Sequence, residues 1–181
     1  HFKGWQHYEW THETGSTQTY MSSVKADHAI DIGFIGQANG TIDINSNSNI
    51  ALNGSLKNNN SLGTTTINTT TGSIMQNGGT IHSDNINLNA VTGIKNINIS
   101  SIGDNINLNA VTTNGDIIIG TTSGLKDGKL TQGNLVLNKV NTGSGVVDLS
   151  AQGNIVQKGS GVSVQGNRIN LNSTLGGIDL I

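Results

Sequence analysis

The chain of 181 residues is long enough for one sizeable domain or for a run of stacked coils. Aromatic residues make up 3% of it and charged residues 11%, well below the roughly 25% charged usage of ordinary globular domains, so a core built around aromatic side chains is not expected. The absence of cysteine excludes disulfides and thiolate metal sites. A net charge of −2, with no apolar run near the roughly 20 residues that span a bilayer, argues against nucleic acid as a partner and against membrane insertion.

Residues 1–28 differ in kind from the rest of the sequence. They hold both tryptophans, both tyrosines and four of the five histidines. We expect this segment to form an irregular lead-in or cap rather than regular coils. The aromatic side chains of Trp5, Tyr8 and Trp10 could stack on a sugar ring, or they could cover the open end of a hydrophobic stack.

Imidazoles and carboxylates also gather in this first segment, at His7, His12 and Glu13. The spacing of the two histidines fits neither the HExxH helix motif nor one face of a strand. We therefore expect no metal site here, and no cofactor elsewhere in the chain.

From residue 29 onward, apolar residues recur in pairs at every second position, with Gly, Asn, Ser, Thr and Asp between the pairs. Alternation of this kind is typical of half-buried strands, and the intervening residues favour tight turns. Examples are Ile30/Ile32, Ile42/Ile44, Ile50/Leu52, Ile86/Leu88, Ile106/Leu108, Ile117/Ile119, Val147/Leu149 and Ile178/Leu180. The pattern predicts that residues 29–181 form one all-β shaft.

One segment, DNINLNAVT, occurs at residues 84–92 and again at residues 104–112. The two copies are offset by 20 residues, a period that is typical of stacked coils. In an antiparallel sandwich, by contrast, corresponding strands face different neighbours, so nothing favours an identical sequence in them. The sequence therefore predicts a parallel β-helix (β-solenoid) of about seven coils of about 20 residues, about 35 Å long. Parallel crossovers favour a right-handed connection.

The offset between the two copies predicts which side chains should lie above one another in this β-helix. Alternation places the apolar residues of each copy in the core and the asparagines on the outside, where amides can form a hydrogen-bonded ladder. The pairs expected to stack are Ile86 on Ile106 and Leu88 on Leu108 inside, and Asn87 on Asn107 and Asn89 on Asn109 outside.

A looser third copy of the motif lies at residues 134–142. Its first residue, Asn134, corresponds to Asn105 of the second copy, so this interval is longer than the one between the first two copies. The extra length predicts an insertion at residues 123–129 that leaves the body of the solenoid as a loop. Because stacking explains the repeated residues, we expect any specific activity to lie in residues 1–28 or near residues 121–132, where the repeat fails.

Three activities known on β-solenoids find little support in the sequence. Acidic residues are sparse, and Asp84 and Asp104 occupy the same turn position of the repeat, so they are expected to form turns rather than a catalytic pair or a calcium site. The GGxGxDxUx calcium repeat is absent. The threonine-rich residues 63–72 occur once, whereas ice binding requires threonines repeated over many coils. We expect no enzyme activity.

Several short sequence segments resemble those of filamentous haemagglutinin-type adhesins, and most closely those of the large leukotoxin-like filamentous adhesins of bacteria. They are AIDI at residues 29–32, GTIDINS at 40–46, NIALNG at 49–54, NINLNA at 85–90 and GDIII at 115–119. The resemblance implies a right-handed β-helical shaft, exported by two-partner secretion and displayed at the cell surface. The proline-containing secretion motifs of that family are missing, so we expect a piece of shaft from a longer polypeptide. No site residue can be carried over from the family.

The expected function is therefore that of a stiff extracellular rod for attachment or surface assembly. Its partners would be other copies of the chain, or glycans and proteins of a host or cell surface. Two alternatives are a self-assembling fibre without an adhesive ligand and a carbohydrate-active β-helix enzyme.

Overall fold

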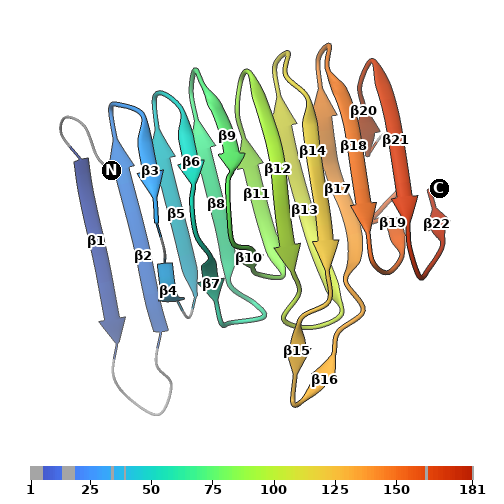
Figure 1. The fold of residues 1–181 in the computed structure, drawn as a ribbon, viewed down its shortest axis with the longest axis horizontal. Helices are drawn as coiled ribbons and strands as arrows, with labels where there is room; N and C mark the ends of the chain where they lie inside the picture. The colour runs from blue at the N-terminus through green and yellow to red at the C-terminus, as the bar shows by residue number, and fades with distance from the viewer. Residues whose placement is uncertain (1–5, 14–18, 34, 39, 162, 181) are drawn as a thin grey trace.

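The computed structural model describes residues 6–13, 19–33, 35–38, 40–161 and 163–180, and every regular element in these ranges is a β-strand (Figure 1). Sheet A contains β1 (Gln6–Glu13), β2 (Thr19–Ala26), β5 (Thr41–Ser46), β8 (Thr64–Thr69), β11 (Asn85–Asn89), β13 (Asn105–Thr112), β17 (Asn134–Thr142), β19 (Ile155–Gln157), β20 (Val164–Gln165) and β22 (Ile178–Asp179). Sheet B contains β3 (Ile30–Ile32), β4 (Ile35–Ala38), β6 (Ile50–Leu52), β7 (Leu56–Asn58), β9 (Ser73–Gln76), β10 (Ile81–His82), β12 (Gly93–Ser100), β14 (Ile117–Thr122), β18 (Val146–Ala151) and β21 (Arg168–Ser173). Two short strands outside both sheets, β15 (Leu125–Lys126) and β16 (Lys129–Leu130), form a hairpin.

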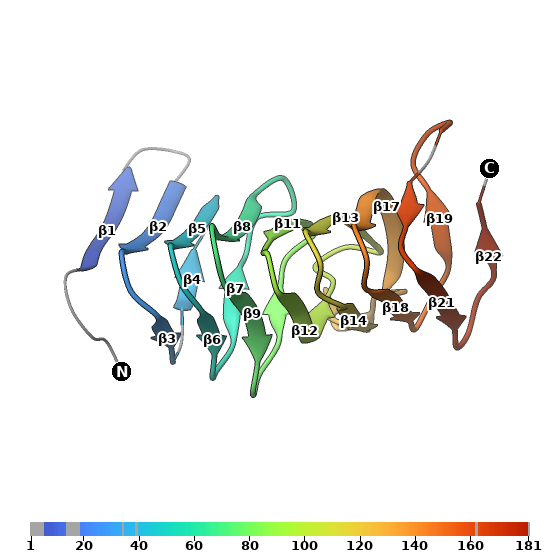
Figure 2. The same ribbon diagram turned by 90° about the horizontal axis from the view of Figure 1, so that it is seen from above.

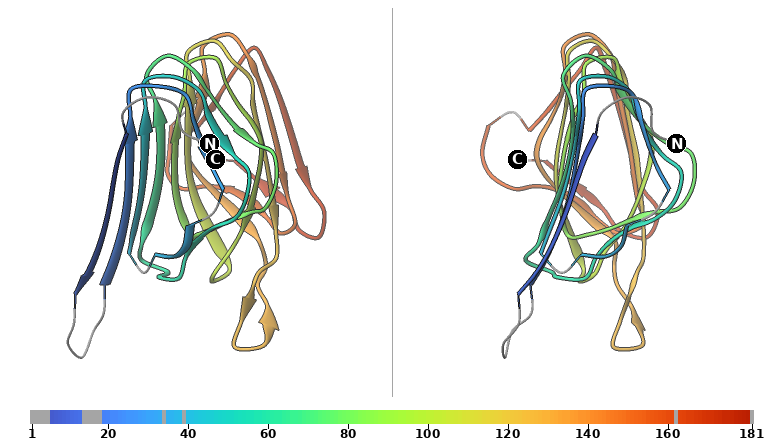
Figure 3. Two further views of the ribbon diagram at one scale, coloured as in Figure 1. Left: turned by 60° about the vertical axis from the view of Figure 1, so that its left-hand side comes forward. Right: turned by 90° about the vertical axis from the view of Figure 1, so that its left-hand side faces the viewer.

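The chain winds repeatedly from sheet A to sheet B and back, and the strands of successive coils pair in parallel (Figures 1 and 3). The result is a parallel β-solenoid of about seven turns with coils of about 22 residues. The predicted all-β solenoid is confirmed, and its right-handedness stays a prediction. Within the described ranges, no helix has the length and apolar character to cross a membrane.

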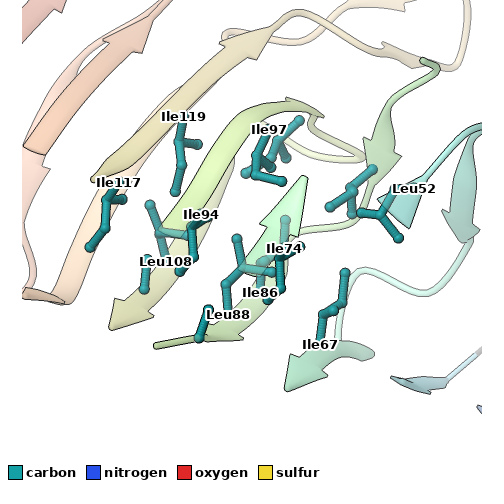
Figure 4. Packing of buried hydrophobic residues seen from close by; sticks show 14 of the residues in the cluster. Leu52, Ile67, Ile74, Ile86, Leu88, Ile94, Ile97, Leu108, Ile117 and Ile119 are labelled. Carbon is teal, nitrogen blue, oxygen red and sulfur yellow. The ribbon is translucent and has the colours of Figure 1, made fainter. Parts of the chain in front are cut away.

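The core is a column of aliphatic side chains between the two sheets (Figure 4). Strand residues alternate between buried and outward-facing positions, as the period of two requires. Ile86 and its neighbours Leu88, Ile106 and Leu108 are at most 1% exposed, so the predicted core positions are confirmed. Each coil therefore supplies a few Ile, Leu or Val side chains to one continuous hydrophobic stack.

The predicted stacking register is wrong by two positions. Strand β11 pairs with β13 so that Ile86 lies beside Leu108 and Leu88 beside Ala110, rather than beside Ile106 and Leu108. Outside, Asn87 pairs with Asn109, and Asn89 pairs with Val111 instead of Asn109. The coil is thus slightly longer than the offset between the two sequence copies. A shift of two keeps every side chain on its predicted face, because only an odd shift exchanges the faces.

The turns that lead from sheet A to sheet B explain this register. Gly115 lies against the turn of the preceding coil, and a Cβ atom on it would be 2.0 Å from the carbonyl oxygen of Thr92. This turn therefore requires glycine at position 115. The register expected from the sequence copies would place Thr113 where there is no room for a side chain. Close backbone contact at the turn, rather than sequence identity, determines how the coils stack.

A buried hydroxyl supports the same turn. Thr112 is 3% exposed, and its Oγ1 donates to the carbonyl oxygen of Gly115. Thr142, one coil later, donates to the same oxygen over 2.8 Å, and its Oγ1 accepts from the Gly145 amide over 3.0 Å. The Thr69 hydroxyl accepts from the Gly72 amide in the same way. A Thr-x-x-Gly turn thus recurs along one edge of the solenoid.

At the amino-terminal end, β1 pairs antiparallel with β2, which in turn pairs in parallel with β5 (Figure 2). The irregular conformation expected for residues 1–28 is therefore wrong for residues 6–13 and 19–26, which are strands. The antiparallel pair departs from the coil pattern. Whether this segment acts as a cap stays a prediction.

The predicted insertion is confirmed. Strand β13 pairs with β17 so that Asn105 lies beside Asn134, and after a bulge Asn109 lies beside Lys139. The additional chain of this coil forms the β15–β16 hairpin. Asp127 and Gly128 have φ values of 52° and 74°, as the tight turn of a hairpin requires. The hairpin projects from the body of the solenoid (Figures 1 and 3).

Candidate functional site

A row of polar side chains crosses the outer face of sheet B beside the β15–β16 hairpin. Lys57 on β7 pairs with His82 on β10, His82 pairs with Ser100 on β12, and Ser100 pairs with Thr122 on β14. Their sequence neighbours on the same strands are buried, so these four side chains point outward. The row brings together an ammonium, an imidazole and two hydroxyls.

This row forms the floor of an open groove of about 500 Å³, which we name the hairpin groove. Its lining residues are Lys57, Asn59, Thr80, His82, Ser100, Thr122, Ser123, Gly124 and Leu125. The last three belong to the insertion at residues 123–129, so the segment where the repeat fails contributes to the wall. The only side chain of the lining that is large and apolar is Leu125, which is 66% exposed.

The base of the hairpin is fixed by buried hydrogen bonds. The hydroxyl oxygens of Ser101 and Thr131 lie 2.6 Å apart, and both side chains are buried. Thr131 Oγ1 also accepts from the Gly124 amide over 2.7 Å, and the Thr131 amide donates to the Gly124 carbonyl over 2.9 Å. These bonds tie the hairpin to the coil beneath it, so the wall of the groove has a defined position.

His82 is the titratable group at the centre of the groove. Its Nδ1 lies 2.9 Å from Ser100 Oγ. Burial of the ring lowers the pKa of His82, Asp84 opposes that shift, and the Lys57 ammonium adds to it. A histidine whose pKa lies below 6.5 is mainly neutral at pH 7, with one ring nitrogen that donates and one that accepts.

Asp84 lies near His82 but is committed to a turn. It is 6% exposed, and its two carboxylate oxygens accept from the amides of Ile102 over 2.7 Å and Gly103 over 2.8 Å. Burial raises the pKa of Asp84, while the two amides, His82 and Lys126 act in the opposite direction. The turn-forming role predicted for this acid is confirmed, and Asp84 does not line the groove.

The groove is better suited to binding than to nucleophilic catalysis. A Ser–His pair needs a third group that orients the imidazole. The residues that line the groove include no carboxylate, and the oxygens of Asp84 are engaged by Ile102 and Gly103. The lining instead offers one ammonium, one imidazole, hydroxyls and an amide, all of which can donate hydrogen bonds.

The predicted asparagine ladder exists in the shifted register. Asn109 Nδ2 donates to Asn87 Oδ1 over 2.9 Å, and Asn107 Nδ2 donates to Asn85 Oδ1 over 3.0 Å. The predicted contacts of Asn87 with Asn107, and of Asn89 with Asn109, are wrong for the reason given above for the turn. Asn85 therefore takes a place in the ladder that the sequence had not assigned to it.

The aromatic candidates of the amino-terminal segment stay predictions. Trp5 lies outside the described residues. Tyr8 and Trp10 belong to strand β1, whose side chains lie outside the description, as do those of His7, His12 and Glu13 in the same strand. In the part of the chain whose side chains are described, no three His, Asp or Glu residues gather in a way that could hold a metal.

Sequence reasoning missed Lys57, His82 and Ser100. The intervals along the chain between successive members of the row are unequal, so no constant period aligns them. Only the proximity of the insertion at residues 121–132 pointed to this region. Comparison of the chain with protein-family models, with curated proteins and with solved structures finds no match.

Proposed function

We propose that this chain is a segment of the shaft of an extracellular bacterial filamentous adhesin. The observation that carries the proposal is the uninterrupted solenoid: about seven coils share one aliphatic core, and no described coil stands apart from its neighbours. A structure of this kind grows by addition of coils and becomes longer without becoming wider. It therefore suits a part whose role is to hold something at a distance.

Two features of the structure support a mechanical role. Parallel strand pairing joins each coil to the next, so local opening must break bonds to both neighbours. Outside, the amide ladder of Asn85, Asn87, Asn107 and Asn109 adds side-chain bonds between coils. In this proposal the segment bears load and presents surfaces, and has no catalytic step.

The proposal is tested on the longest natural polypeptide that contains this chain. Negative-stain electron microscopy should show rods of constant width, and limited proteolysis should leave residues 40–161 intact apart from cuts in the exposed β15–β16 hairpin. Heat-denatured protein serves as the control for intrinsic protease sites. Globular particles, or rapid cleavage throughout these residues, would contradict the proposal.

A second candidate is a fibre in which copies of the chain assemble end to end. Ile169 is 41% exposed, Ile178 46% and Leu180 42%. The strand partners of the first two in the preceding coil, Val147 and Ile155, are fully buried. A following coil, whether from a longer chain or from another copy, would cover these side chains and extend both sheets. Size-exclusion chromatography at several concentrations, with imaging, tests this candidate, and a species that stays monomeric at high concentration would rule it out.

A further inference from the structure

We propose that the hairpin groove binds an acidic sugar residue of a polysaccharide that runs along the solenoid axis. The carboxylate of the sugar would lie between Lys57 and His82, and its hydroxyls would bond to Ser100, Thr122 and Asn59. This inference rests on the proposed function only in locating the groove at a cell surface. It names the ligand class and the residues that recognise it.

Charge points to an anion. The groove lining contains Lys57 and His82 but no acidic residue. The nearest described acid that acts on His82 is Asp84, whose carboxylate is already held by the amides of Ile102 and Gly103. Lys126, on the hairpin, is a further cation near this acid. An oxyanion in the groove would therefore meet donors and cations without a competing carboxylate in the lining.

The spacing of the donors points to an extended ligand. Strands of a sheet lie about 4.7–4.9 Å apart, so the four side chains from Lys57 to Thr122 span about 14 Å along the solenoid axis. The Lys57 ammonium and the His82 imidazole lie at one end of this row and the two hydroxyls at the other. A ligand with one charged group followed by hydroxyls matches this order, and a sugar acid with its glycosidic neighbour has that composition.

Two other anionic polymers fit less well. An acidic peptide gains most of its affinity on β-proteins by pairing with a free strand edge, but β7, β10, β12 and β14 are adjacent interior strands of sheet B. A nucleic acid carries closely spaced phosphates and is bound by dense cationic surfaces, whereas this lining has a single lysine in a chain of net charge −2. Sparse charge among hydroxyls favours a polysaccharide.

The hairpin supplies the remaining element, an apolar wall. Leu125 is exposed on the groove side of a hairpin whose base is fixed by Ser101 and Thr131. The C–H face of a sugar ring can pack on this side chain while the hydroxyls face the sheet. Since the base of the wall is fixed before binding, less entropy is lost when the ligand is held.

The experiment measures binding of oligogalacturonate and of the same oligosaccharide with every carboxyl methyl-esterified, by calorimetry and by NMR signals of the His82 ring. The ester keeps the hydroxyls and removes the charge. We expect the acid form to bind and to shift the His82 signals, and the ester to bind at least about tenfold more weakly, as loss of a charge-assisted hydrogen bond implies. Equal binding of the two forms, or no binding of either, would overturn the proposal.

Variants locate the site. Lys57→Gln and Ser100→Ala should each weaken binding of the acid form by about tenfold, since the first removes the ammonium charge and the second removes a hydroxyl donor. Lys139→Gln is the matched control, because Lys139 is an exposed lysine on sheet A. Circular dichroism verifies that each variant is folded. An equal loss in the control would show nonspecific charge attraction and contradict the assignment.

Inorganic phosphate and free galacturonate are the remaining probes. A response to phosphate that equals that of the oligosaccharide would show a general anion site and overturn the choice of a sugar. The outcome is separable from that of the shaft proposal. Rods without binding would refute the groove alone, whereas binding by a globular particle would refute the shaft alone.

Discussion

The two copies of DNINLNAVT have the same residues and different structures. In the first copy strand β11 ends at Asn89 and Thr92 is exposed, whereas in the second β13 continues to Thr112, which is 3% exposed. Asp84 is buried and accepts two amide bonds, whereas its counterpart Asp104 is exposed and accepts one, from Gln132, over 3.1 Å. The copies also stack out of step, because no residue of the first lies beside its own counterpart in the second.

The difference shows which part of a coil sets the register. In the core, a shift of two residues exchanges one aliphatic side chain (Ile, Leu or Ala) for another. The core therefore tolerates both the register expected from the sequence copies and the observed one. At the turn, by contrast, Gly115 packs on the backbone of Thr92 and Gly93, and no side chain fits. The identical residues determine which faces are inside, and the glycine that follows them determines the alignment.

The largest expected effect distinguishes the two registers directly. Asn87→Cys with Asn109→Cys should form a disulfide under mild oxidation, because strand partners lie close to the roughly 4.4–6.8 Å that a disulfide spans between Cα atoms. Asn87→Cys with Asn107→Cys should not, since that pair is offset diagonally and lies about 8 Å apart. The chain has no other cysteine, so a mass spectrum of the peptides reads the result unambiguously. The opposite pattern would restore the register expected from the sequence copies.

The next prediction concerns the turn that fixes this register. Gly115→Ala should lower the free energy of unfolding by about 3 kcal/mol, the upper part of the usual range for overpacking, because the new Cβ would lie 2.0 Å from backbone atoms of Thr92. Gly159→Ala is the matched control, since nothing lies within 4 Å of a Cβ there. Urea unfolding followed by circular dichroism compares the two. Equal stability of the two variants would show that the turn adapts and does not set the alignment.

A feature of this fold could be predicted where it depends on residues close together in the sequence, and could not where it depends on contacts between different coils. Alternation of apolar and polar residues predicted the solenoid and its buried positions, such as Ile86 and Leu108. The longer interval between the second and third copies of the motif predicted the insertion. Both signals are local in the sequence. The register could not be predicted, because the contact between Gly115 and Thr92 requires two coils to be compared in space. The hairpin groove could not be predicted either. Its residues come from coils of unequal length, so no constant interval in the sequence shows that they are neighbours.

The third prediction tests the two copies of the aspartate. Asp84→Ala should destabilise the protein by about 2 kcal/mol, because two amides lose their acceptor in a partly buried turn. Asp104→Ala should cost less than about 0.5 kcal/mol, as expected of an exposed residue with a single bond. The same urea titrations measure both. Similar losses would mean that the two copies are equivalent in energy despite their different surroundings.

The smallest expected effect depends on His82, which precedes the first copy at the position where the second copy has Ile102. Because the pKa of His82 is lowered in the folded protein, its contribution to stability is present above about pH 6.5 and is lost as the pH falls toward the lowered pKa. The raised pKa of Asp84 acts in the opposite direction, since its contribution is present at low pH and is lost as the pH rises through that pKa.

The His82 contribution can be isolated by substitution. Between about pH 7.5 and 5.5, wild-type protein should lose more stability than His82→Gln, by less than about 1 kcal/mol because the ring is only partly buried. Thermal unfolding at each pH measures the difference. If His82→Gln and wild type have parallel profiles, folding does not change the pKa of His82, and the ring is as well hydrated in the folded state as in the unfolded chain.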